Sequence, residues 1–501
     1  MYLQVDERTS RILRTIQRCN PNKSPVYLVG GAVRDLVLGL PTLDLDFVTA
    51  KGSMALSAAA RKQLGGVGFT LDDERETARV ILNQGKVDEL SLDFVRFSGE
   101  DLQADLRARD FTINAMALAL DTPDQVIDPL GGLEDLKARI LRVASVESMA
   151  LDPLRVIRGV RMARGYDLSI DPETERLMRV ATKGLGRITG ERIRDEFFKI
   201  LELPGKARSI ELMDQLGIVD ELWPEFKAVK QMEAIPPHTH PLWKHTLQVI
   251  YYLEAIMQTL EPDAEGMGSR YGLVGIGDIL FPYQQDIVRH LERSGPNGRR
   301  REELLFLAAL CHDLGKPETR SVDQEGKTHF YRHAEEGVAI TEEIGNRLKL
   351  ANEEKAYLAS VVGNHMRLHL LANEPAKPSD RAIYRYFQAC EGQGVDIALL
   401  SVADLAATYE NRLTLERFTR ELVVVVDVME AWFKRKQQVI DPIPLLNGDM
   451  LQQELGLAAG RELGLVLRRL KEAQASGEVN DREEALAYAR KILEEGEAGE
   501  R

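Results

Sequence analysis

Hydrophobic and polar residues alternate near the N-terminus in a pattern that predicts a short strand–helix–strand unit. An apolar run at 27–29 indicates a buried strand, the two glycines that follow allow a turn, and residues 32–38 suit a helix. Residues 43–48 alternate strictly, so the three hydrophobic side chains of a second strand should be buried. Four further elements are expected in this region: helices over 1–24 and 54–64, and strands over 78–82 and 89–97. The first 135 residues should therefore form a mixed β-sheet with helices packed on it.

Beyond residue 135, hydrophobic residues recur mainly with the spacing of amphipathic helices, and we expect an almost wholly helical remainder. The expected fold class is therefore α+β. A chain of 501 residues is long enough for two to four domains. We expect a head with a mixed sheet (1–135), a helical neck (136–235), a histidine-rich helical domain (236–410) and a helical tail (411–501). The stretch 261–300 is interpreted as an insertion.

The composition is that of a soluble globular protein, with 44% hydrophobic and 29% charged residues. The longest aliphatic run, residues 422–426, is far too short to cross a bilayer, and no membrane association is expected. Cys19, Cys311 and Cys390 are widely scattered. This argues against a disulfide framework and suits a reducing, cytoplasmic location, with each thiol buried.

The second strand carries a pair of carboxylates. Asp44 and Asp46 are two residues apart, so they share one face of the strand, about 6.6–6.8 Å apart along it. Hard oxygen ligands of this kind suit Mg²⁺. Just upstream, Gly31 and the helix start allow close approach of an anion, and Arg34 could contact phosphate. The pattern predicts a cradle for a nucleoside triphosphate beside a metal site; the alternative is a glycine turn and two solvated aspartates.

Residues 30–35 (GGAVRD) and 44–46 (DLD) resemble the first motif of the class II tRNA nucleotidyltransferase and poly(A) polymerase family, which includes the CCA-adding enzymes. The resemblance implies that Asp44 and Asp46 are catalytic metal ligands. The family has an acidic residue on a neighbouring strand, where this sequence has Asp93. Asp93 is therefore a candidate third carboxylate, with an exposed strand aspartate as the equal alternative.

Residues 106–118 (LRARDFTINAMAL) resemble the second motif of the family, RRDFTINA, with Ala108 in place of its first arginine. The resemblance implies that Arg109 and Asp110 contact the sugar and phosphate of the incoming nucleotide, and Asn114 could reinforce them. A plain helix cap is the alternative for Thr112 or Asn114. Only residues 98–105 precede this motif after the last strand. In the family, a short loop here goes with enzymes that add CC without the final A.

Residues 151–163 resemble the nucleotide-selecting helix of the family. Asp152 and Arg155 are one turn apart and are expected to pair with the base, while Arg158 and Arg161 contact the base or the triphosphate. Where Leu151 stands, the family commonly has an acidic residue. A basic helix without specificity is the alternative. In the following motif (190–201), Arg192, Glu196 and Lys199 are interpreted as structural ion pairs.

The histidine-rich domain has the residue order of an HD-type phosphohydrolase domain, which it resembles. The resemblance implies that the core metal ligands are His245, His312, Asp313 and Asp404. It also implies a possible second metal, completed by His333 and His365. Imidazole and carboxylate ligands suit Ni²⁺, Mn²⁺, Fe or Co, as well as Mg²⁺. Lys316 could add positive charge. The other histidines are interpreted as ordinary core or surface residues: His238, His240, His290, His329 and His369.

The resemblance implies an enzyme that adds CCA, or part of it, to tRNA 3′ ends from CTP and ATP by two-metal nucleotidyl transfer. Its HD domain would act as a phosphatase or phosphodiesterase. Alternatives are a CC-adding enzyme, an A-adding enzyme, a poly(A) polymerase and, from another class, a nucleotide-sensing HD phosphohydrolase. The net charge of −14 is unfavourable for RNA binding, but arginines concentrate between residues 139 and 194 and could form a local patch.

Overall fold

The computed structural model describes residues 5–86, 88–261, 275–295 and 297–499. The chain divides into two compact units. Unit 1 comprises Met1–Glu196 with Leu212–Leu222, and unit 2 comprises Phe197–Glu211 with Trp223–Arg501. Residues 262–274, the centre of the proposed insertion, lie outside the described residues.

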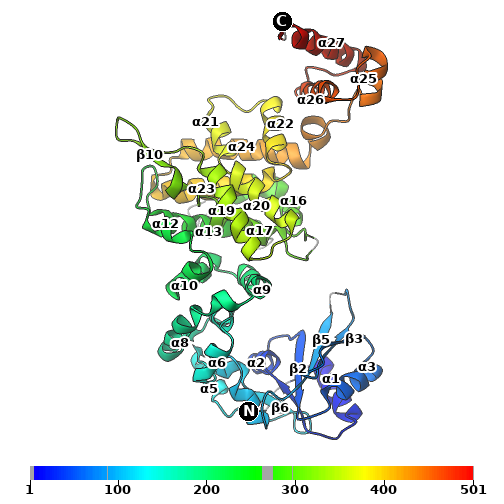
Figure 1. Cartoon of the computed structure of the whole chain (residues 1–501), viewed down its shortest axis with the longest axis vertical. Coiled ribbons are helices and arrows are strands. Elements are labelled where there is room, and N and C mark those ends of the chain that lie inside the picture. Colours follow the sequence, from blue (N-terminus) through cyan, green and yellow to red (C-terminus); the bar gives the residue numbers. More distant parts are fainter. Residues whose placement is uncertain (1–4, 87, 262–274, 296, 500–501) are drawn as a thin grey trace. The chain divides into compact units, whose positions relative to one another are not determined.

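A mixed sheet forms the centre of unit 1, as predicted, and it has seven strands, more than the four that the sequence indicated (Figure 1). Its strand order is β3-β4-β5-β2-β1-β6-β7, and β2 and β5 run parallel while the other neighbours are antiparallel. The strands are β1 (Val26–Val29), β2 (Asp44–Thr49), β3 (Val67–Asp72), β4 (Thr77–Leu82), β5 (Leu90–Arg96), β6 (Ala117–Ala119) and β7 (Val126–Ile127). Helix α3 packs on β4 and β5, and α1 packs on α3.

Two of the three hydrophobic side chains that the alternation around β2 predicted to be buried are buried. Leu45 and Phe47 are each 1% exposed, and Phe47 stacks on Phe94 of β5. Leu43 is 53% exposed, and its predicted burial was wrong because it precedes the strand. Strand β3 was not predicted; most of its side chains are exposed, since it lies at the edge of the sheet.

The remaining elements of unit 1 are mainly helices. They are α1 (Glu7–Cys19), α2 (Gly31–Leu38), α3 (Ser53–Leu64), α4 (Leu102–Arg107), η1 (Thr112–Asn114), α5 (Gly132–Ala138), α6 (Val146–Leu151), α7 (Arg155–Gly165), α8 (Pro172–Thr182), η2 (Leu185–Arg187) and α11 (Ile218–Leu222), with short paired strands β8 (Ile140–Leu141) and β9 (Ser169–Ile170). Helix α9 (Gly190–Leu201) crosses the division between the units, and α10 (Lys206–Gln215) follows it. The predicted helix over 151–163 begins only at Arg155, because Asp152 has extended backbone dihedrals.

Unit 2 is almost wholly helical, which confirms the predicted fold class. Its elements are α12 (Phe226–Gln231), α13 (Leu242–Gln258), α15 (Ile276–Leu280), η3 (Phe281–Tyr283), α16 (Gln284–Leu291), α17 (Arg301–Cys311), α18 (Lys316–Thr319), α19 (His333–Arg347), α20 (Asn352–Asn364), α21 (Arg367–Asn373), α22 (Asp380–Ala389), α23 (Gly394–Tyr409), η4 (Glu410–Arg412), α24 (Leu415–Phe433), η5 (Lys436–Ile440), α25 (Gly448–Leu455), α26 (Arg461–Ala475) and α27 (Arg482–Gly499). A small hairpin joins β10 (Arg320–Val322) and β11 (Thr328–Phe330).

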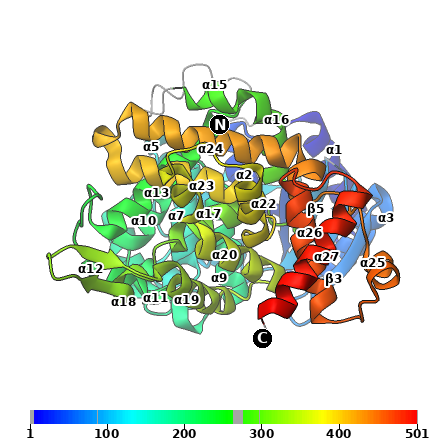
Figure 2. The same cartoon turned by 90° about the horizontal axis from the view of Figure 1, so that it is seen from above.

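Helix α23 is the core element of unit 2. It is hydrophobic around nearly its whole circumference, and most of its residues are buried. Helix α13 packs along α23, and α24 runs beside it in both views (Figures 1 and 2). Such an all-round apolar helix needs neighbours on every side. Asp396, Ser401 and Thr408, polar residues of α23, are consequently buried among those neighbours.

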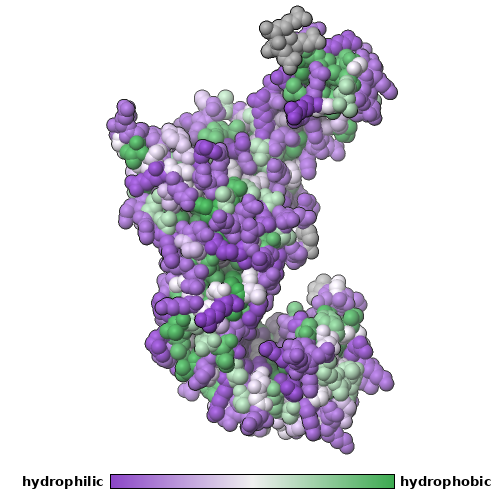
Figure 3. Space-filling model, viewed as in Figure 1, coloured by the Kyte–Doolittle hydropathy of each residue, from purple (hydrophilic) through white to green (hydrophobic). Residues whose placement is uncertain are grey.

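Hydrophilic residues cover most of the face seen in the space-filling view (Figure 3). Among the described residues, no helix combines the length and hydrophobicity that a bilayer span requires. The three cysteines are free thiols. Cys311 and Cys390 are buried as predicted, but Cys19 is only partly buried, because it ends the surface helix α1.

Candidate functional site

Strand β2 presents Asp44 and Asp46 on the face opposite Leu45, as the alternation predicted. Asp46 lies between Val29 of β1 and Asp93 of β5 in the strand register. Burial raises the pKa of Asp46, Arg109 partly offsets this, and the neighbouring carboxylates Asp93 and Asp44 raise it further. The charged form of Asp46 therefore needs more positive charge than the neighbouring arginines supply, and a divalent metal ion at the carboxylate pair would provide it.

Asp93 is adjacent to Asp46, but it has a partner. Arg79 of β4 donates from Nε and Nη2 to its two carboxylate oxygens, each at 2.7 Å. This bidentate pair shares the charge of Asp93 with a cation already in the protein. The structure thus brings Asp93 to the site beside Asp46, while its role as a metal ligand stays a prediction.

The glycine turn leaves room for the site. Gly30 has φ of 76° and ψ of −142°, a conformation essentially confined to glycine. A Cβ at this position would lie 2.9 Å from Arg109 Nη1 and 3.2 Å from Asp46 Oδ2. Gly31 is the first residue of α2, and a Cβ there would lie 3.3 Å from Arg34 Nη2. The turn therefore brings the backbone close to the side chains of Arg109, Asp46 and Arg34.

Arg34 is buried and fully engaged by the protein. It pairs with Asp35 at 2.9 Å, donates to Asn114 Oδ1 at 2.6 Å, and bonds the hydroxyl of Tyr166, whose ring lies 4.1 Å from the guanidinium carbon. Burial raises the pKa of Tyr166 to about 12, so the hydroxyl stays protonated. Tyr166 was not among the predicted site residues, and its distance of 132 residues along the chain from Arg34 explains why.

The second motif forms a hydrogen-bonded cluster around Asp110. Asn114 Nδ2 donates to Asp110 Oδ1 at 3.0 Å, and Arg158 of α7 lies 3.1 Å from Asp110 Oδ2. Burial would raise the pKa of Asp110, but Arg158 and these hydrogen bonds outweigh it and hold the pKa below its usual value. Thr112 donates to the buried Asp135 at 2.7 Å and caps no helix. Asn114 reinforces Asp110 as expected from its position.

Arg109 is held by Asp105 at 3.2 Å, a buried carboxylate that the sequence analysis did not single out. Asp105 lies four residues before Arg109, a spacing at which helical side chains meet. It also accepts from the backbone N–H of Ser98, at 2.9 Å. Asp105 therefore joins the loop after β5 to the second motif.

The arginines of α7 have different partners. Arg155 donates to three backbone carbonyls, those of Ala108 at 2.8 Å, Ser148 at 3.1 Å and Arg109 at 3.2 Å. Asp152 pairs with Arg192 at 2.7 Å, and Arg161 pairs with Glu196 at 2.8 Å. Asp152 and Arg155 thus have separate partners here, and two residues of α9 hold side chains that were predicted to contact the nucleotide.

A cavity of about 330 Å³ joins these groups. It is lined by Gly30, Gly31, Arg34, Asp46, Arg109, Asp110, Asn114, Arg155, Arg158, Arg161 and Met162. Most of the predicted nucleotide contacts therefore surround one space beside the carboxylates of β2. Six of the lining side chains, five arginines and one asparagine, are cationic or carboxamide groups that donate hydrogen bonds to anions, so the cavity suits a phosphorylated ligand.

The six predicted ligands of the HD domain come together at the centre of unit 2. His245 belongs to α13, the His312–Asp313 pair follows α17, His333 begins α19, His365 follows α20 and Asp404 lies on α23. Potential ligand atoms lie within 4.8 Å of one another in the groups His245–His312–Asp404 and Asp313–His333–His365. Asp313 also lies 3.5 Å from His245, so it links the two groups.

The orientation of the imidazoles suits a metal. His312, His333 and His365 each place Nδ1 2.7–2.8 Å from a backbone carbonyl, which makes Nδ1 the protonated nitrogen. The Nε2 atoms of His333 and His365 lie 3.2 Å apart, and both can bind a metal ion. Burial lowers the pKa of His365 to about 3, so its ring is neutral. Among the described residues, the buried atoms His312 Nε2 and Asp313 Oδ1 have no hydrogen-bond partner. A metal ion would satisfy both.

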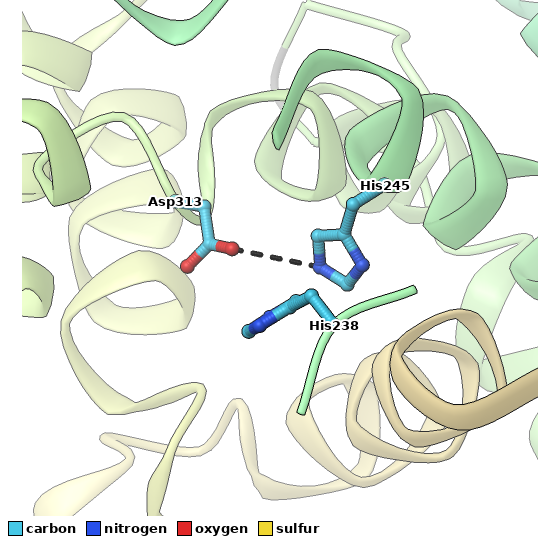
Figure 4. Close-up of side chains that lie close together, drawn as sticks. All are labelled: His238, His245 and Asp313. Carbon is cyan, nitrogen blue, oxygen red and sulfur yellow. Dashed lines mark ion pairs between the residues drawn. The ribbon is translucent and has the colours of Figure 1, made fainter. Parts of the chain in front are cut away.

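His238 was interpreted as an ordinary histidine, but it lies beside this cluster (Figure 4). Its ring centroid is 4.6 Å from that of His245, and it forms a possible ligand group with His245 and Asp313. Lys316 lies between His238 Nε2 (3.1 Å) and Asp313 Oδ2 (2.6 Å), where it adds the predicted positive charge. Burial, with Lys316, lowers the pKa of His238 to about 4. The three histidines within residues 238–245 were the one feature of the sequence that could have indicated a place for His238 at this site.

The other histidines interpreted as ordinary have carboxylate partners. His240 pairs with Glu410, His329 with Asp323 and His290 with Asp396. None of these three carboxylates is in the described metal-ligand groups. His369 differs, because it contacts Asp404 at 3.0 Å.

Comparison with known proteins identifies the domains of the chain. The sequence matches the poly A polymerase head domain over residues 26–142, the probable RNA and SrmB-binding site of polymerase A over 167–230, and the HD domain over 242–386. It is 32% identical to an A-adding tRNA nucleotidyltransferase of Deinococcus radiodurans, over 93% of this chain and 95% of that protein. It is 31% identical to a CC-adding tRNA nucleotidyltransferase of Thermus thermophilus, over 92% of each chain.

The fold is similar to that of solved CCA-adding enzymes. The structure of a CCA-adding enzyme complexed with CTP matches with a TM-score of 0.63 and 23% identity, over 98% of this chain and 96% of that one. Nucleotidyltransferase and HD domains are both metal-dependent, and the described residues include candidate metal-binding groups. On the extent and identity of these matches, the chain belongs to the tRNA nucleotidyltransferase and poly(A) polymerase family of enzymes and carries an HD domain.

Proposed function

We propose that this enzyme adds CCA, or part of it, to the 3′ end of tRNA from CTP and ATP. One observation carries the proposal: Asp46, on the strand that also bears Asp44, lines the same cavity as five arginine side chains. A carboxylate pair suited to divalent cations is thus adjacent to a space suited to a triphosphate. The names of the A-adding and CC-adding relatives support tRNA as the acceptor.

In this proposal Asp44 and Asp46 hold two Mg²⁺ ions, with Asp93 as a third carboxylate. Ions held by these carboxylates would supply the Lewis-acid chemistry for nucleotidyl transfer to a 3′-OH. The carboxylates fix where this chemistry occurs, because β2 is buried against its neighbours on its opposite face. Arg79 fixes the orientation of the Asp93 carboxylate through two hydrogen bonds.

Gly31 and Arg34 are proposed to hold the triphosphate, and Arg109, Asp110 and Asn114 the sugar. The first turn of α2 offers unpaired backbone N–H groups to a phosphate. Asp110 is ionised and can accept from a ribose 2′-OH, which favours a ribonucleotide. Arg34 would reach phosphate by exchanging one of its present partners.

Asp152, Arg155, Arg158 and Arg161 are proposed to select the base. A bidentate contact to a base edge gives about 1–3 kcal/mol of discrimination. Because Arg155 now bonds carbonyls of the second motif, base contact by Arg155 requires these bonds to be exchanged. Two residues of α9 form ion pairs with proposed base-selecting residues, Arg192 with Asp152 and Glu196 with Arg161. Helix α9 would therefore help to orient the side chains that select the base.

Within this proposal the short segment 98–105 favours CC as the product, while CCA, A alone and poly(A) are the alternatives. The relatives do not separate these products, because the A-adding protein is 32% identical and the CC-adding proteins are 31% and 30% identical. Residues 136–235 and the tail 411–501 are proposed to be separate domains, with the tail binding tRNA. We place this activity in the cytoplasm, where free thiols are stable.

For the HD domain we propose a metal-dependent phosphatase or phosphodiesterase. The proposed ligands are His245, His312, Asp313 and Asp404, with His333 and His365 completing a second metal position. Ni²⁺, Mn²⁺, Fe, Co or Mg²⁺ would supply a hydroxide for hydrolysis. Lys316 is placed to attract phosphate, since its ammonium group lies 2.6 Å from Asp313.

The transferase proposal is tested with tRNA that ends before CCA. CTP and ATP are supplied separately and together, and product lengths are read on a gel. Asp44→Ala should abolish extension, while His312→Ala, which alters the other unit, should extend normally. Extension by Asp44→Ala would overturn the proposal. Loss of extension in His312→Ala, with phosphohydrolysis kept, would reverse the roles proposed for the two sites. No extension by the unaltered enzyme, together with phosphohydrolysis that His312→Ala abolishes, would instead favour the nucleotide-sensing HD phosphohydrolase.

A further inference from the structure

Three buried residues outside the proposed ligand set form a chain of contacts that ends at Asp404. His369 of α21 places Nε2 3.0 Å from Asp404 Oδ2 and Nδ1 2.7 Å from Glu421 Oε1 of α24. Ser401, one turn before Asp404 on α23, donates its hydroxyl to the same Glu421 oxygen at 2.7 Å. All three side chains are buried, with His369 7%, Glu421 2% and Ser401 1% exposed.

This chain of contacts fixes the two oxygens of Asp404 differently. A carboxylate can only accept, so His369 donates to Asp404 from one nitrogen and to Glu421 from the other. Oδ2 of Asp404 is thereby occupied. Oδ1 faces the cluster, 3.1 Å from His245 Nε2, and also accepts from Thr408 at 3.2 Å. Oδ1 is consequently the oxygen of Asp404 that would contact a metal ion bound in the cluster.

We infer that His369 and Glu421, supported by Ser401, form a clamp that presents Asp404 Oδ1 to the metal of the HD domain. The inference rests on the proposed metal site and adds positioning residues to it. Residues that orient a metal ligand commonly change metal affinity by about 10–100-fold when they are replaced. His369→Gln should weaken binding by an amount in this range. Glu421→Gln should weaken it less, since its amide oxygen can still accept from His369.

The same helix offers a matched control. His290 places Nε2 2.8 Å from Asp396 Oδ2, and both residues are buried. Asp396 lies on α23, two turns before Asp404, but it is outside the described ligand groups. His290→Gln therefore removes a buried histidine–aspartate pair from the same helix without altering a proposed ligand. A purely structural effect should appear in both glutamine variants.

The experiment measures Co²⁺ binding to the full chain by calorimetry and by its visible absorption. Asp44→Ala/Asp46→Ala serves as the common background, so that the transferase carboxylates do not contribute. In this background, His369→Gln should raise the Kd for Co²⁺ by about 10–100-fold and shift the absorption band. His290→Gln should leave the Kd within about twofold and the band unchanged, because ligand geometry is intact.

Equal affinities and spectra for His369→Gln and His290→Gln would overturn the clamp and leave the metal site standing. Absence of Co²⁺ binding in the background protein would overturn the metal site and the clamp with it. If His369→Gln does not fold, Glu421→Gln decides: an unshifted band together with unchanged affinity rejects the clamp.

Discussion

Gly30 provides the sharpest test of how the turn shapes the transferase site. In Gly30→Ala the new methyl group would lie 2.9 Å from Arg109 Nη1 and 3.2 Å from Asp46 Oδ2. Both atoms are side-chain ends, so they would shift by a few tenths of an ångström rather than unfold the sheet. Misplacement by about 1 Å costs about 100-fold in rate, and a smaller shift of two groups should cost roughly tenfold in kcat/KM.

The backbone strain of Gly30→Ala has a matched control. Gly65 has φ of 79° and ψ of −175°, close to the conformation of Gly30, and no atom lies within 4 Å of a Cβ built there. Both substitutions should lower the free energy of unfolding by about 1–3 kcal/mol. Only Gly30→Ala should also lose CTP incorporation, measured as kcat/KM on tRNA lacking CCA. Equal kcat/KM for the two variants would refute the crowding argument.

Three further predictions concern stability. The pKa of Asp46 is raised, so the native state binds this proton more tightly than the unfolded chain does, and stability falls as pH rises through that pKa. Asp46→Asn should therefore raise the melting temperature at pH 7 without metal. A lower melting temperature would contradict this. Arg158→Ala removes the ion-pair partner of the buried Asp110 Oδ2 and should lower the free energy of unfolding in urea by about 1–3 kcal/mol, whereas Arg176→Ala, at an exposed pair, should change it little. Divalent metal at 100 times its Kd should stabilise the protein by about 2.7 kcal/mol, measured by urea unfolding in the Asp44→Ala/Asp46→Ala background, and His312→Ala should abolish that gain.

Local pattern was enough to predict most elements around the transferase site. Strict alternation identified the face that carries Asp44 and Asp46, since one buried face specifies the register of a strand. It failed at Leu43, which lies just outside the strand, and at β3, whose exposed edge position leaves little hydrophobic signal. Resemblance supplied the residues of the second motif and of α7, which no periodicity distinguishes.

Partners distant in sequence could not be predicted. Asn114 and Tyr166, the partners of Arg34, lie 80 and 132 residues away from it. Motif spacing indicates which residues belong to a site but not how their charges are shared in the folded state. The same reason explains why His238 and His369 were interpreted as ordinary residues, because their proximity to the HD ligands arises from the packing of separate helices.

The central claim is that the carboxylates of β2 bind divalent ions beside a glycine turn that receives a triphosphate. The most direct measurement is a crystal structure of the enzyme with CTP and Mn²⁺, with the ions located by anomalous scattering. We predict Mn²⁺ in contact with Asp44 and Asp46, and the triphosphate against Gly31 within the cavity that Arg158 lines. Mn²⁺ remote from both aspartates, or CTP bound elsewhere in the chain, would contradict the account.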